Sequence, residues 1–212
     1  MWGTGNHGRG PRNCLRFERY DPSRFEANVL QGETMTFQGF RLMFPQDEIG
    51  HWAARYPQGW DEPALKAGSN IRDGDYSREN LEIIVRWKSE RRVALIAENS
   101  DAEISEALQL ARQAQEPRNA FAVLMGLRGV GTPMASAILT ATDQEKYTVI
   151  DYRALEALGA SESDTNLGFC LRYYFPECKR LASEANVSLR MLDRALWSWS
   201  NENTNAPAVG QR

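Results

Sequence analysis

The stretch GLRGVGTPMASAIL, residues 126–139, decides the fold that we expect of this chain. It places three glycines within six residues and then continues with Thr132, Pro133 and a run of small and apolar residues. Glycine adopts positive φ angles without steric cost and lets the backbone approach a neighbour closely. The stretch therefore predicts a tight hairpin between two helices, with Thr132 as the N-cap and Pro133 as the first residue of the second helix.

The amide groups of this hairpin form a candidate anion site. The first N–H groups of an α-helix have no partner within the helix, so together with neighbouring glycine amides they can bind a negatively charged group. The same pattern is also typical of a plain turn between two helices. Other motifs in the sequence are needed to decide between an anion site and a plain turn.

The overall composition is that of an ordinary globular protein. The chain has 212 residues, of which 42% are hydrophobic, and a net charge of −3. This length allows one large domain or two small lobes. We find neither an apolar run of the roughly 18 residues that a membrane span needs nor the apolar segment of a signal peptide. We therefore expect a cytoplasmic protein, nucleoid-associated if prokaryotic, with no membrane partner.

The cysteines and histidines argue against a metal centre. Cys14, Cys170 and Cys178 show no C-x-x-C spacing, and the two histidines, His7 and His51, lie far apart. An iron–sulfur cluster held by four thiolates, or a structural zinc site, cannot be assembled from this set. We expect buried or unreactive thiols and no iron–sulfur cluster.

The character of the sequence changes along the chain. Residues 1–13 and 204–212 are typical of flexible tails. Residues 14–75 appear irregular in pattern, with one candidate strand or hairpin at TMTFQGFRLMF, residues 34–44. Residues 76–203 are helical in pattern. We therefore expect a mainly α protein with an irregular, partly β N-terminal segment.

Two helices of the 76–203 region have clear start signals. Ser77 is a candidate N-cap for the first, and a Ser-Asp cap begins the second, SDAEISEALQLARQAQ at residues 100–115, which ends near Pro117. In the first helix, Leu81, Ile84, Val85 and Lys88 recur at helical spacing and so lie on one face. Lys88 on an apolar stripe must either extend its amine to solvent or point into a cleft.

The order of motifs around the hairpin resembles that of the helix-hairpin-helix (HhH-GPD) DNA glycosylase superfamily. In that family an apolar helix, a Gly-Val-Gly hairpin and a second helix precede a catalytic aspartate at the start of a further helix. The matching residues are Leu127, Gly129, Val130, Gly131, Ala135, Ile138, Leu139, Val149, Ile150 and Asp151. The resemblance extends over about residues 76–203 and is specific only within 124–158. It implies a two-lobed helical fold.

The resemblance also implies a grip on duplex DNA that contains a damaged or modified base. The residues of this grip would be Leu127, Arg128, Gly129, Val130, Gly131 and Thr132. Family members often hold a monovalent cation, K⁺ or Na⁺, on hairpin carbonyls, which here would be those of Leu127 and Val130; no other cofactor is expected. The target nucleotide is flipped into a pocket between the lobes. We expect the protein to act as a monomer.

Asp151 would stand at the deoxyribose of the flipped nucleotide. There its carboxylate would stabilise the positive charge that develops as the base leaves, or activate water. Asp151 is also a good N-cap for the helix that follows it, and the two roles are compatible because the family aspartate lies at a helix start. A capping carboxylate has a lowered pKa, which suits an electrostatic stabiliser better than a general acid.

Pro133 distinguishes this chain from the bifunctional branch of the family. Members of that branch carry a lysine just inside the second helix, whose amine attacks the sugar and forms a Schiff base. Pro133 has no nucleophile, and Lys146 lies far along the loop, so a displaced nucleophile at Lys146 is the alternative. We therefore expect a monofunctional hydrolase that leaves an abasic site and has no β-lyase activity.

The segment IIVRWKSERR, residues 83–92, stands where the family places the helix that faces the flipped base. The candidate residues for the base pocket or DNA wedge are Trp87, Lys88, Ser89, Arg91 and Trp197. Trp87 would stack on a base and the polar residues would reach DNA; alternatively, Trp87 is part of the core and the basic residues face solvent. Trp197 and Trp199 cannot share a helix face, so at most one of them lines a cleft with Asp151.

Three functions are compatible with these patterns. The first is a DNA glycosylase of base excision repair. The second is a non-catalytic DNA-binding module that keeps the hairpin, and Asp151 is the residue that separates it from the first. The third is a helical interaction domain with no nucleic-acid role, for which the acidic net charge is the best support.

Overall fold

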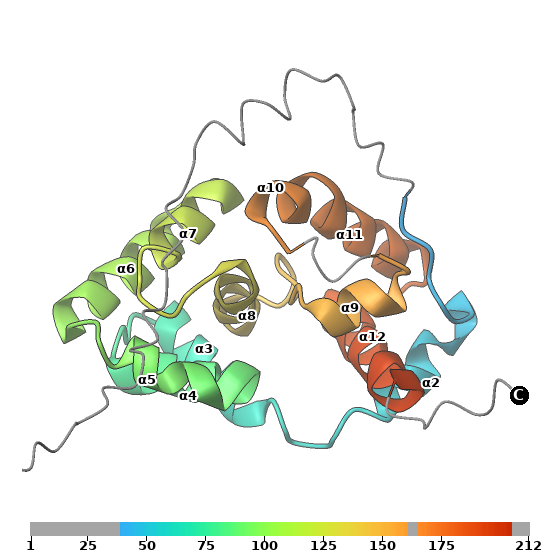
Figure 1. The fold of residues 1–212 in the computed structure, drawn as a ribbon, viewed down its shortest axis with the longest axis horizontal. Helices are drawn as coiled ribbons and strands as arrows, with labels where there is room; N and C mark the ends of the chain where they lie inside the picture. The colour runs from blue at the N-terminus through green and yellow to red at the C-terminus, as the bar shows by residue number, and fades with distance from the viewer. Residues whose placement is uncertain (1–38, 161–164, 205–212) are drawn as a thin grey trace, which may run out of the picture. The chain divides into compact units, whose positions relative to one another are not determined.

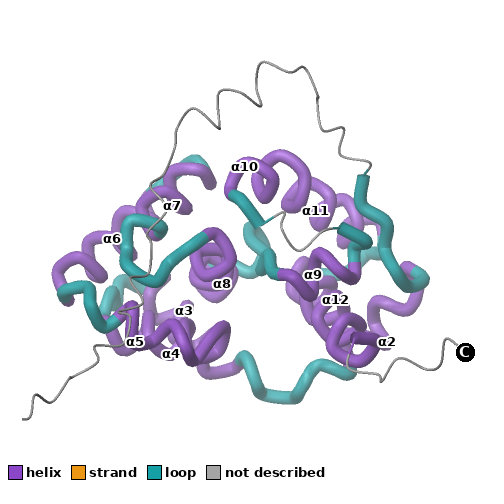
Figure 2. Tube along the Cα trace, viewed as in Figure 1, coloured by secondary structure: helices purple, strands orange, loops and turns teal. Residues whose placement is uncertain are grey.

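The computed structural model describes residues 39–160 and 165–204, and this part of the chain contains helices and no strand (Figure 2). The expectation of a mainly α protein is therefore confirmed. The chain divides into two units, Met1–Gly39 and Phe40–Arg212. All described residues except Gly39 belong to the second unit. The tail predicted at 1–13, and all but the first residue of the tail predicted at 204–212, lie outside the described residues.

The helices of this unit form two groups, each packed within itself (Figure 1). The first group consists of α3 (Glu62–Arg72), α4 (Arg78–Ser89), η2 (Glu90–Arg92), α5 (Val93–Ile96), α6 (Asp101–Gln113), α7 (Pro117–Leu124) and α8 (Thr132–Thr142). Helix α8 packs against α3, α4 and α7. All of its residues except Pro133 are buried, as expected for a helix that has small and apolar side chains on every face.

The second group is organised around the long helix α12. It consists of η1 (Gln46–Glu48), α2 (Ile49–Ala54), α9 (Tyr152–Ala157), α10 (Leu167–Phe169), a π-helical turn η3 (Cys170–Tyr174), α11 (Phe175–Glu184) and α12 (Leu189–Thr204). Helix α12 packs against α2, α9 and α11. The chain therefore starts in the second group, crosses to the first between α2 and α3, and returns between α8 and α9.

The prediction of an irregular, partly β segment at 14–75 is wrong for the part of it that the structure describes. Helices α2 and α3 lie in this segment, and residues 39–44 form no strand. Residues 14–38 lie outside the described part. The buried stripe of α3 is Ala64, Ala67, Gly68 and Ile71. Because three of these four residues are Ala or Gly, the hydrophobic periodicity is too weak to reveal the helix.

The described end of the predicted strand, residues 39–44, is bonded to the end of a helix. The Arg41 N–H donates to the Leu158 carbonyl, and the Met43 N–H donates to the Ala157 carbonyl, each at 2.9 Å. These bonds place the segment before α2 along the C-terminal end of α9. The partner of this segment is therefore a helix end and not another strand.

The two predicted start signals have different outcomes. Ser100 and Glu103 form a capping box at the start of α6, with the Glu103 N–H donating to Ser100 Oγ at 3.2 Å. Ser77 stands at the N-cap position of α4, but its hydroxyl caps no backbone N–H. It accepts instead from the Asn80 side-chain amide at 3.0 Å.

The two cysteines within the described residues are buried free thiols, as predicted. Burial raises the pKa of Cys170 to about 12 and also raises the pKa of Cys178. Cys14 lies outside the described residues. In the described ranges, each helix is either too short or too polar to cross a membrane.

Candidate functional site

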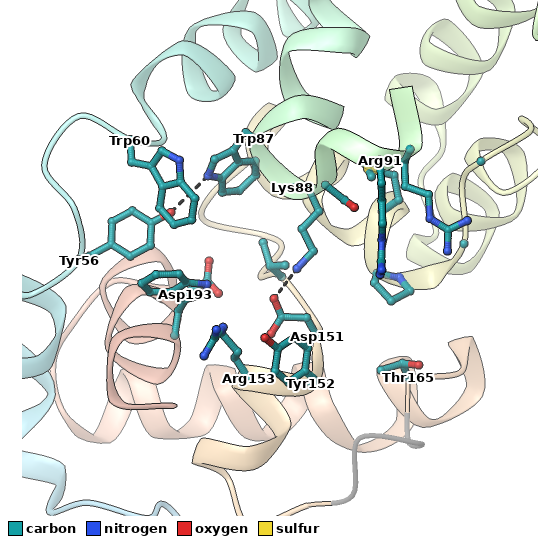
Figure 3. Close-up of a pocket in the computed structure, with 18 of the residues that line it drawn as sticks. Tyr56, Trp60, Trp87, Lys88, Arg91, Asp151, Tyr152, Arg153, Thr165 and Asp193 are labelled. Carbon is teal, nitrogen blue, oxygen red and sulfur yellow. Dashed lines mark hydrogen bonds and ion pairs between the residues drawn. The ribbon is translucent and has the colours of Figure 1, made fainter. Parts of the chain in front are cut away.

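A cavity of about 510 Å³ lies between the two groups of helices (Figure 3). Cavities of roughly 300–1,000 Å³ are usual for small-molecule sites. The end of α4, the hairpin, the segment before α9 and helix α12 all contribute to its walls. The cavity brings together every residue predicted for the catalytic site and the base pocket: Asp151, Trp87, Lys88, Ser89, Arg91 and Trp197, with Gly129 and Gly131 of the hairpin.

Asp151 is held on both sides of its carboxylate. It is the N-cap of α9, and its Oδ1 accepts from the Ala154 N–H at 2.9 Å, as predicted. Its Oδ2 forms an ion pair with Nζ of Lys88, and each of these side chains is only 15% exposed. The carboxylate is therefore fixed in position at the cavity wall.

The surroundings of Asp151 keep it ionised. Burial alone would raise the pKa of this carboxyl. The Lys88 ammonium outweighs that effect through its charge and its hydrogen bond, with help from the Ala154 amide and the charge of Arg153, so the pKa of Asp151 lies below its ordinary value. At neutral pH the cavity contains a carboxylate and not a carboxylic acid.

Lys88 reaches Asp151 because of its place on α4. Leu81, Ile84 and Val85 on the same stripe are fully buried, and Lys88 follows one turn later in the last turn of the helix. Its stem continues the apolar stripe and its amine enters the cavity. Of the two expectations for Lys88, the cleft is therefore confirmed.

The hairpin between α7 and α8 is shaped by Gly129. This residue has a φ of 85°, and a Cβ added to it would lie 2.9 Å from the Leu95 Cβ. Gly131 has an ordinary φ of −104° and is the N-cap of α8. The expectation that Thr132 is the N-cap is therefore wrong: Thr132 is the first residue of the helix, and its buried hydroxyl contacts the sulfur of Met125 at 3.8 Å.

Asn99, which was not predicted from the sequence, links the hairpin to the segment that follows α5 by two hydrogen bonds. Its Oδ1 accepts from the Arg128 N–H at 2.8 Å and its Nδ2 donates to the Arg128 carbonyl at 3.1 Å. Asn99 is buried, as are the side chains of Leu127 and Val130. These two predicted contact residues can therefore offer a ligand only their backbone groups.

The backbone groups of the hairpin differ in availability. Within the described residues, the N–H groups of Gly129, Gly131 and Thr132 donate to no protein acceptor. The Leu127 carbonyl, one of the two predicted cation ligands, accepts from the Val130 N–H at 3.2 Å. The free amides point to an anion as the natural ligand of this turn.

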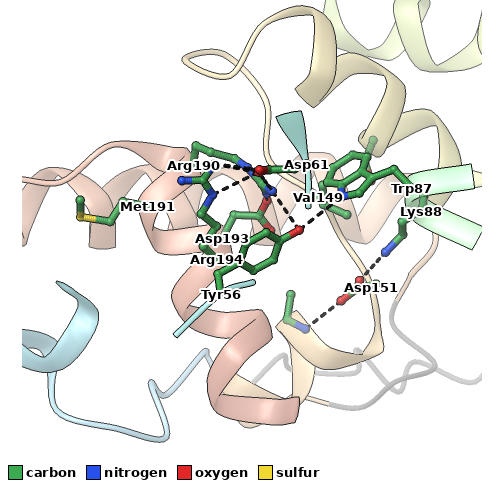
Figure 4. Close-up of polar contacts among 12 residues, drawn as sticks. Tyr56, Asp61, Trp87, Lys88, Val149, Asp151, Arg190, Met191, Asp193 and Arg194 are labelled. Carbon is green, nitrogen blue, oxygen red and sulfur yellow. Dashed lines mark hydrogen bonds and ion pairs between the residues drawn. The ribbon is translucent and has the colours of Figure 1, made fainter. Parts of the chain in front are cut away.

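A buried charge network supports the cavity wall formed by Trp87 (Figure 4). The guanidinium of Arg190, on α12, lies 5.2 Å from the ring centres of both Tyr56 and Trp87. It forms ion pairs with Asp61 and Asp193. The Tyr56 hydroxyl accepts from the Trp87 Nε1–H at 3.2 Å. Because Arg190 covers one face of Trp87, that face cannot stack on a base.

Asp193 differs from Asp151 in its electrostatic environment. Burial raises the pKa of Asp193 to about 6, against the opposing charge of Arg190 and with a further contribution from the negative charge of Asp151. The two carboxyls of the cavity thus have pKa values displaced in opposite directions. Such a difference is common where charged groups serve a function.

Tyr56, Trp60 and Trp197 contact one another along one wall of the cavity. The Trp60 and Trp197 rings meet at 5.0 Å and 64°, and Tyr56 contacts Trp197 at 5.3 Å. Trp60 remains 44% exposed. Trp199 packs instead against Phe44 at 6.1 Å, so only one of the two late tryptophans lines the cavity, as predicted.

Several cavity residues were not predicted from the sequence. These are Tyr56, Trp60, Arg153, Arg190 and Asp193. Arg190, Asp193 and Trp197 recur every three or four residues along α12, so a polar stripe on an amphipathic helix was the available signal. Tyr56 and Trp60 precede α3 in a loop, where no periodicity marks them.

The described residues provide no obvious metal centre of the acidic, histidine or thiolate kind. Across residues 39–160 and 165–204, no cluster of three or more His, Cys, Asp or Glu side chains is arranged to hold a metal ion.

No known protein family, curated protein or solved structure gives a match to this chain.

Proposed function

We propose that this protein is a DNA glycosylase with the HhH-GPD fold, which flips a damaged or modified base into the cavity and hydrolyses its N-glycosidic bond. The observation that supports this proposal most strongly is Asp151, an ionised, immobilised carboxylate on the same cavity as the free amides of the hairpin. The path of the chain, which leaves one helix group and returns to it after the hairpin, agrees with a two-lobed arrangement of this kind.

The chemistry follows from the charge that develops during cleavage. As the base leaves, the deoxyribose acquires oxocarbenium character, and a fixed anion beside it lowers the energy of the transition state. The lowered pKa of Asp151 ensures that this anion is present at neutral pH. Asp151 also has the position and charge to orient a water molecule for attack on the sugar.

Lys88 acts in this scheme as a positioning residue. Its ammonium holds Asp151 Oδ2 while the Ala154 amide holds Oδ1. An ammonium nitrogen in an ion pair has no lone pair with which to attack the sugar. With Pro133 at the position where the bifunctional branch carries its lysine, we propose simple hydrolysis that leaves an abasic site.

The grip on DNA would come from the hairpin and the basic residues beside it. The free N–H groups of Gly129, Gly131 and Thr132 suit a phosphate at the N-terminus of α8. Arg91 and Arg92 line the same cavity and add positive charge. A K⁺ or Na⁺ ion on the Leu127 and Val130 carbonyls would belong to the same grip, and a monomer suffices for it.

One observation favours a second candidate, a DNA-binding module without catalysis. Lys88 already neutralises Asp151 in the structure, so the carboxylate could be purely a structural link between the helix groups. The candidates differ in one outcome, because only the glycosylase releases a base.

The experiment is base release from a panel of duplexes with deaminated, oxidised, alkylated or hypermodified bases. Alkali converts each abasic site into a strand break, which is then counted on a denaturing gel. The glycosylase proposal expects breaks with at least one duplex. Tight binding to duplex DNA with no break in any member of the panel would favour the second candidate.

A further inference from the structure

The cavity contains one buried hydrogen-bond donor that the protein leaves unused. Nη1 of Arg153 is inaccessible to solvent and has no hydrogen-bond partner within the described residues. Buried polar groups are nearly always paired, and those that are not commonly mark the place of a ligand or water. Arg153 also lines the cavity, so its side chain borders the space in which a molecule would bind.

The guanidinium of Arg153 is held in place by two aromatic rings. It lies 5.1 Å from the ring centre of Tyr152 and 5.4 Å from that of Trp197. Stacking of this kind orients the planar guanidinium while leaving its edge free for hydrogen bonds. In Figure 3 the side chain extends into the cavity below Asp151, on the side of Asp193.

Arg153 lies beside Asp151, at a place where it would contact the base of the flipped nucleotide and not the sugar. Asp151 is the residue proposed to face the deoxyribose, and Arg153 follows it by two residues at the start of α9. The base is attached to the carbon that Asp151 would face. A guanidinium beside Asp151 on the same cavity would therefore lie near the flipped base.

Trp60 completes the subsite with a stacking surface. The residue is 44% exposed, and its ring meets that of Trp197, over which the Arg153 guanidinium lies. Arg190 covers a face of Trp87, whereas Trp60 is one of the exposed large hydrophobic residues. A base that stacks on Trp60 would occupy the same cavity as the Arg153 side chain.

The charges of the cavity select against a positively charged base. Its described lining includes five basic residues and two acidic ones: Lys88, Arg91, Arg92, Arg153 and Arg190 against Asp151 and Asp193. Both carboxylates are already paired, Asp151 with Lys88 and Asp193 with Arg190. A cationic base would find no unpaired carboxylate among these residues, whereas a carbonyl oxygen or ring nitrogen would meet the guanidinium of Arg153.

We infer that Arg153 is a specificity-determining residue that selects uncharged bases with hydrogen-bond acceptors on their edge, such as deaminated or oxidised bases, over cationic alkylated bases. This inference rests on the proposed glycosylase function, since it names the substrate class of that site. Arginine recognises acceptor pairs such as O6 and N7 of guanine in the same manner on duplex DNA.

The test separates recognition from chemistry. Duplexes carry a single 2′-fluorinated nucleotide, whose glycosidic bond resists cleavage, with uracil, hypoxanthine or N7-methylguanine as the base. Dissociation constants are measured at one salt concentration, because salt alters DNA affinity strongly. The wild-type protein is expected to bind the uracil or hypoxanthine duplex about ten-fold or more tightly than the cationic N7-methylguanine duplex.

Two variants and one control identify the source of the preference. Arg153→Met should reduce the preference to within about three-fold, and Arg153→Gln, which keeps a donor without the charge, should restore part of it. Arg172→Met removes an exposed arginine that does not line the cavity and should leave the preference unchanged. Equal binding of the three duplexes by the wild type, or a preference that survives in Arg153→Met, would overturn the inference.

Base release from matching duplexes with ordinary deoxyribose distinguishes the two proposals. Release of N7-methylguanine but not of uracil or hypoxanthine would overturn the role of Arg153 and leave the glycosylase proposal standing. A binding preference without release of any base, either from these duplexes or from the wider panel, would support the role of Arg153 in recognition and remove the glycosylase proposal. Absence of binding to every duplex would overturn both.

Discussion

Nζ of Lys88, in the last turn of α4, forms an ion pair with Oδ2 of Asp151 at the N-cap of α9 (Figure 3). The two residues are 63 positions apart in the chain. Helix α4 belongs to one group of helices and α9 to the other, so the ion pair bridges the cavity between the groups. A charge pair at this place controls both the position and the ionisation of the candidate catalytic carboxylate.

Replacing Lys88 by methionine should move the acid limb of the pH–rate profile for base release. Without the ammonium, burial dominates and the pKa of Asp151 rises, because the positive charge of Lys88 no longer favours the ionised carboxylate. Activity would then be lost at a higher pH than in the wild type as Asp151 becomes protonated. Lys88→Arg keeps the charge and should keep the limb in place. An identical limb in Lys88→Met would show that the ion pair does not control Asp151.

Borohydride treatment during the reaction should trap no covalent adduct between the wild-type protein and DNA. Trapping requires a Schiff base. Pro133 stands where the bifunctional glycosylases that the hairpin resembles carry a lysine, and Lys88 is ion-paired with Asp151. Denaturing electrophoresis of labelled duplex detects any adduct. An adduct that disappears in Lys88→Arg would assign the nucleophile to Lys88 and refute hydrolysis.

Gly131→Asp and Gly131→Asn form a matched pair for the hairpin. A Cβ at Gly131 would meet no atom closer than 4.0 Å, and φ there is −104°, so both side chains fit. Both are also favoured N-cap residues, so thermal stability should be kept. The aspartate alone places a negative charge where a phosphate is proposed to bind. We expect about ten-fold weaker duplex binding for Gly131→Asp than for Gly131→Asn, and equal affinities would refute the phosphate grip.

Gly68→Ala should destabilise the fold through the contact between α3 and α8. An added Cβ would lie 2.0 Å from the Ala141 carbonyl oxygen, which is backbone of a buried helix and cannot move aside cheaply. We expect a loss of about 2 kcal/mol or more in the free energy of unfolding, measured by denaturant titration. Gly50→Ala on α2, where no atom lies within 4 Å, is the control and should change stability by at most about 1 kcal/mol. Similar values for the two variants would contradict the close α3–α8 contact.

Local signals in the sequence were sufficient for several features of the fold. The capping box at Ser100 and Glu103 and the N-cap at Asp151 depend on residues three positions apart, so the sequence determines them directly. The positive φ of Gly129, 85°, is one that glycine adopts without steric cost, so the residue type itself indicates it. Each of these involves short-range geometry, for which residue type is a good guide.

Features that depend on packing between distant segments could not be predicted in the same way. The small residues on the buried stripe of α3 gave no periodic signal, although Gly68 is what lets α3 approach α8. The partner of Lys88 is 63 residues away, and the partner of Arg190 at Asp61 is 129 residues away. Its place on the apolar stripe of the helix identified Lys88 as a cleft candidate, but only the folded chain joins it to Asp151.

The central claim is that Asp151 assists cleavage of the N-glycosidic bond, and single-turnover base release by Asp151→Asn tests it most directly. Asparagine also caps a helix well, so this variant should keep the fold and the affinity for duplex DNA. Asp101→Asn, at an exposed position on α6 away from the cavity, is the matched control. With a duplex that the wild type cleaves, we predict a rate at least about 100-fold lower for Asp151→Asn and an unchanged rate for Asp101→Asn. A rate for Asp151→Asn within a few-fold of the wild type would contradict the claim.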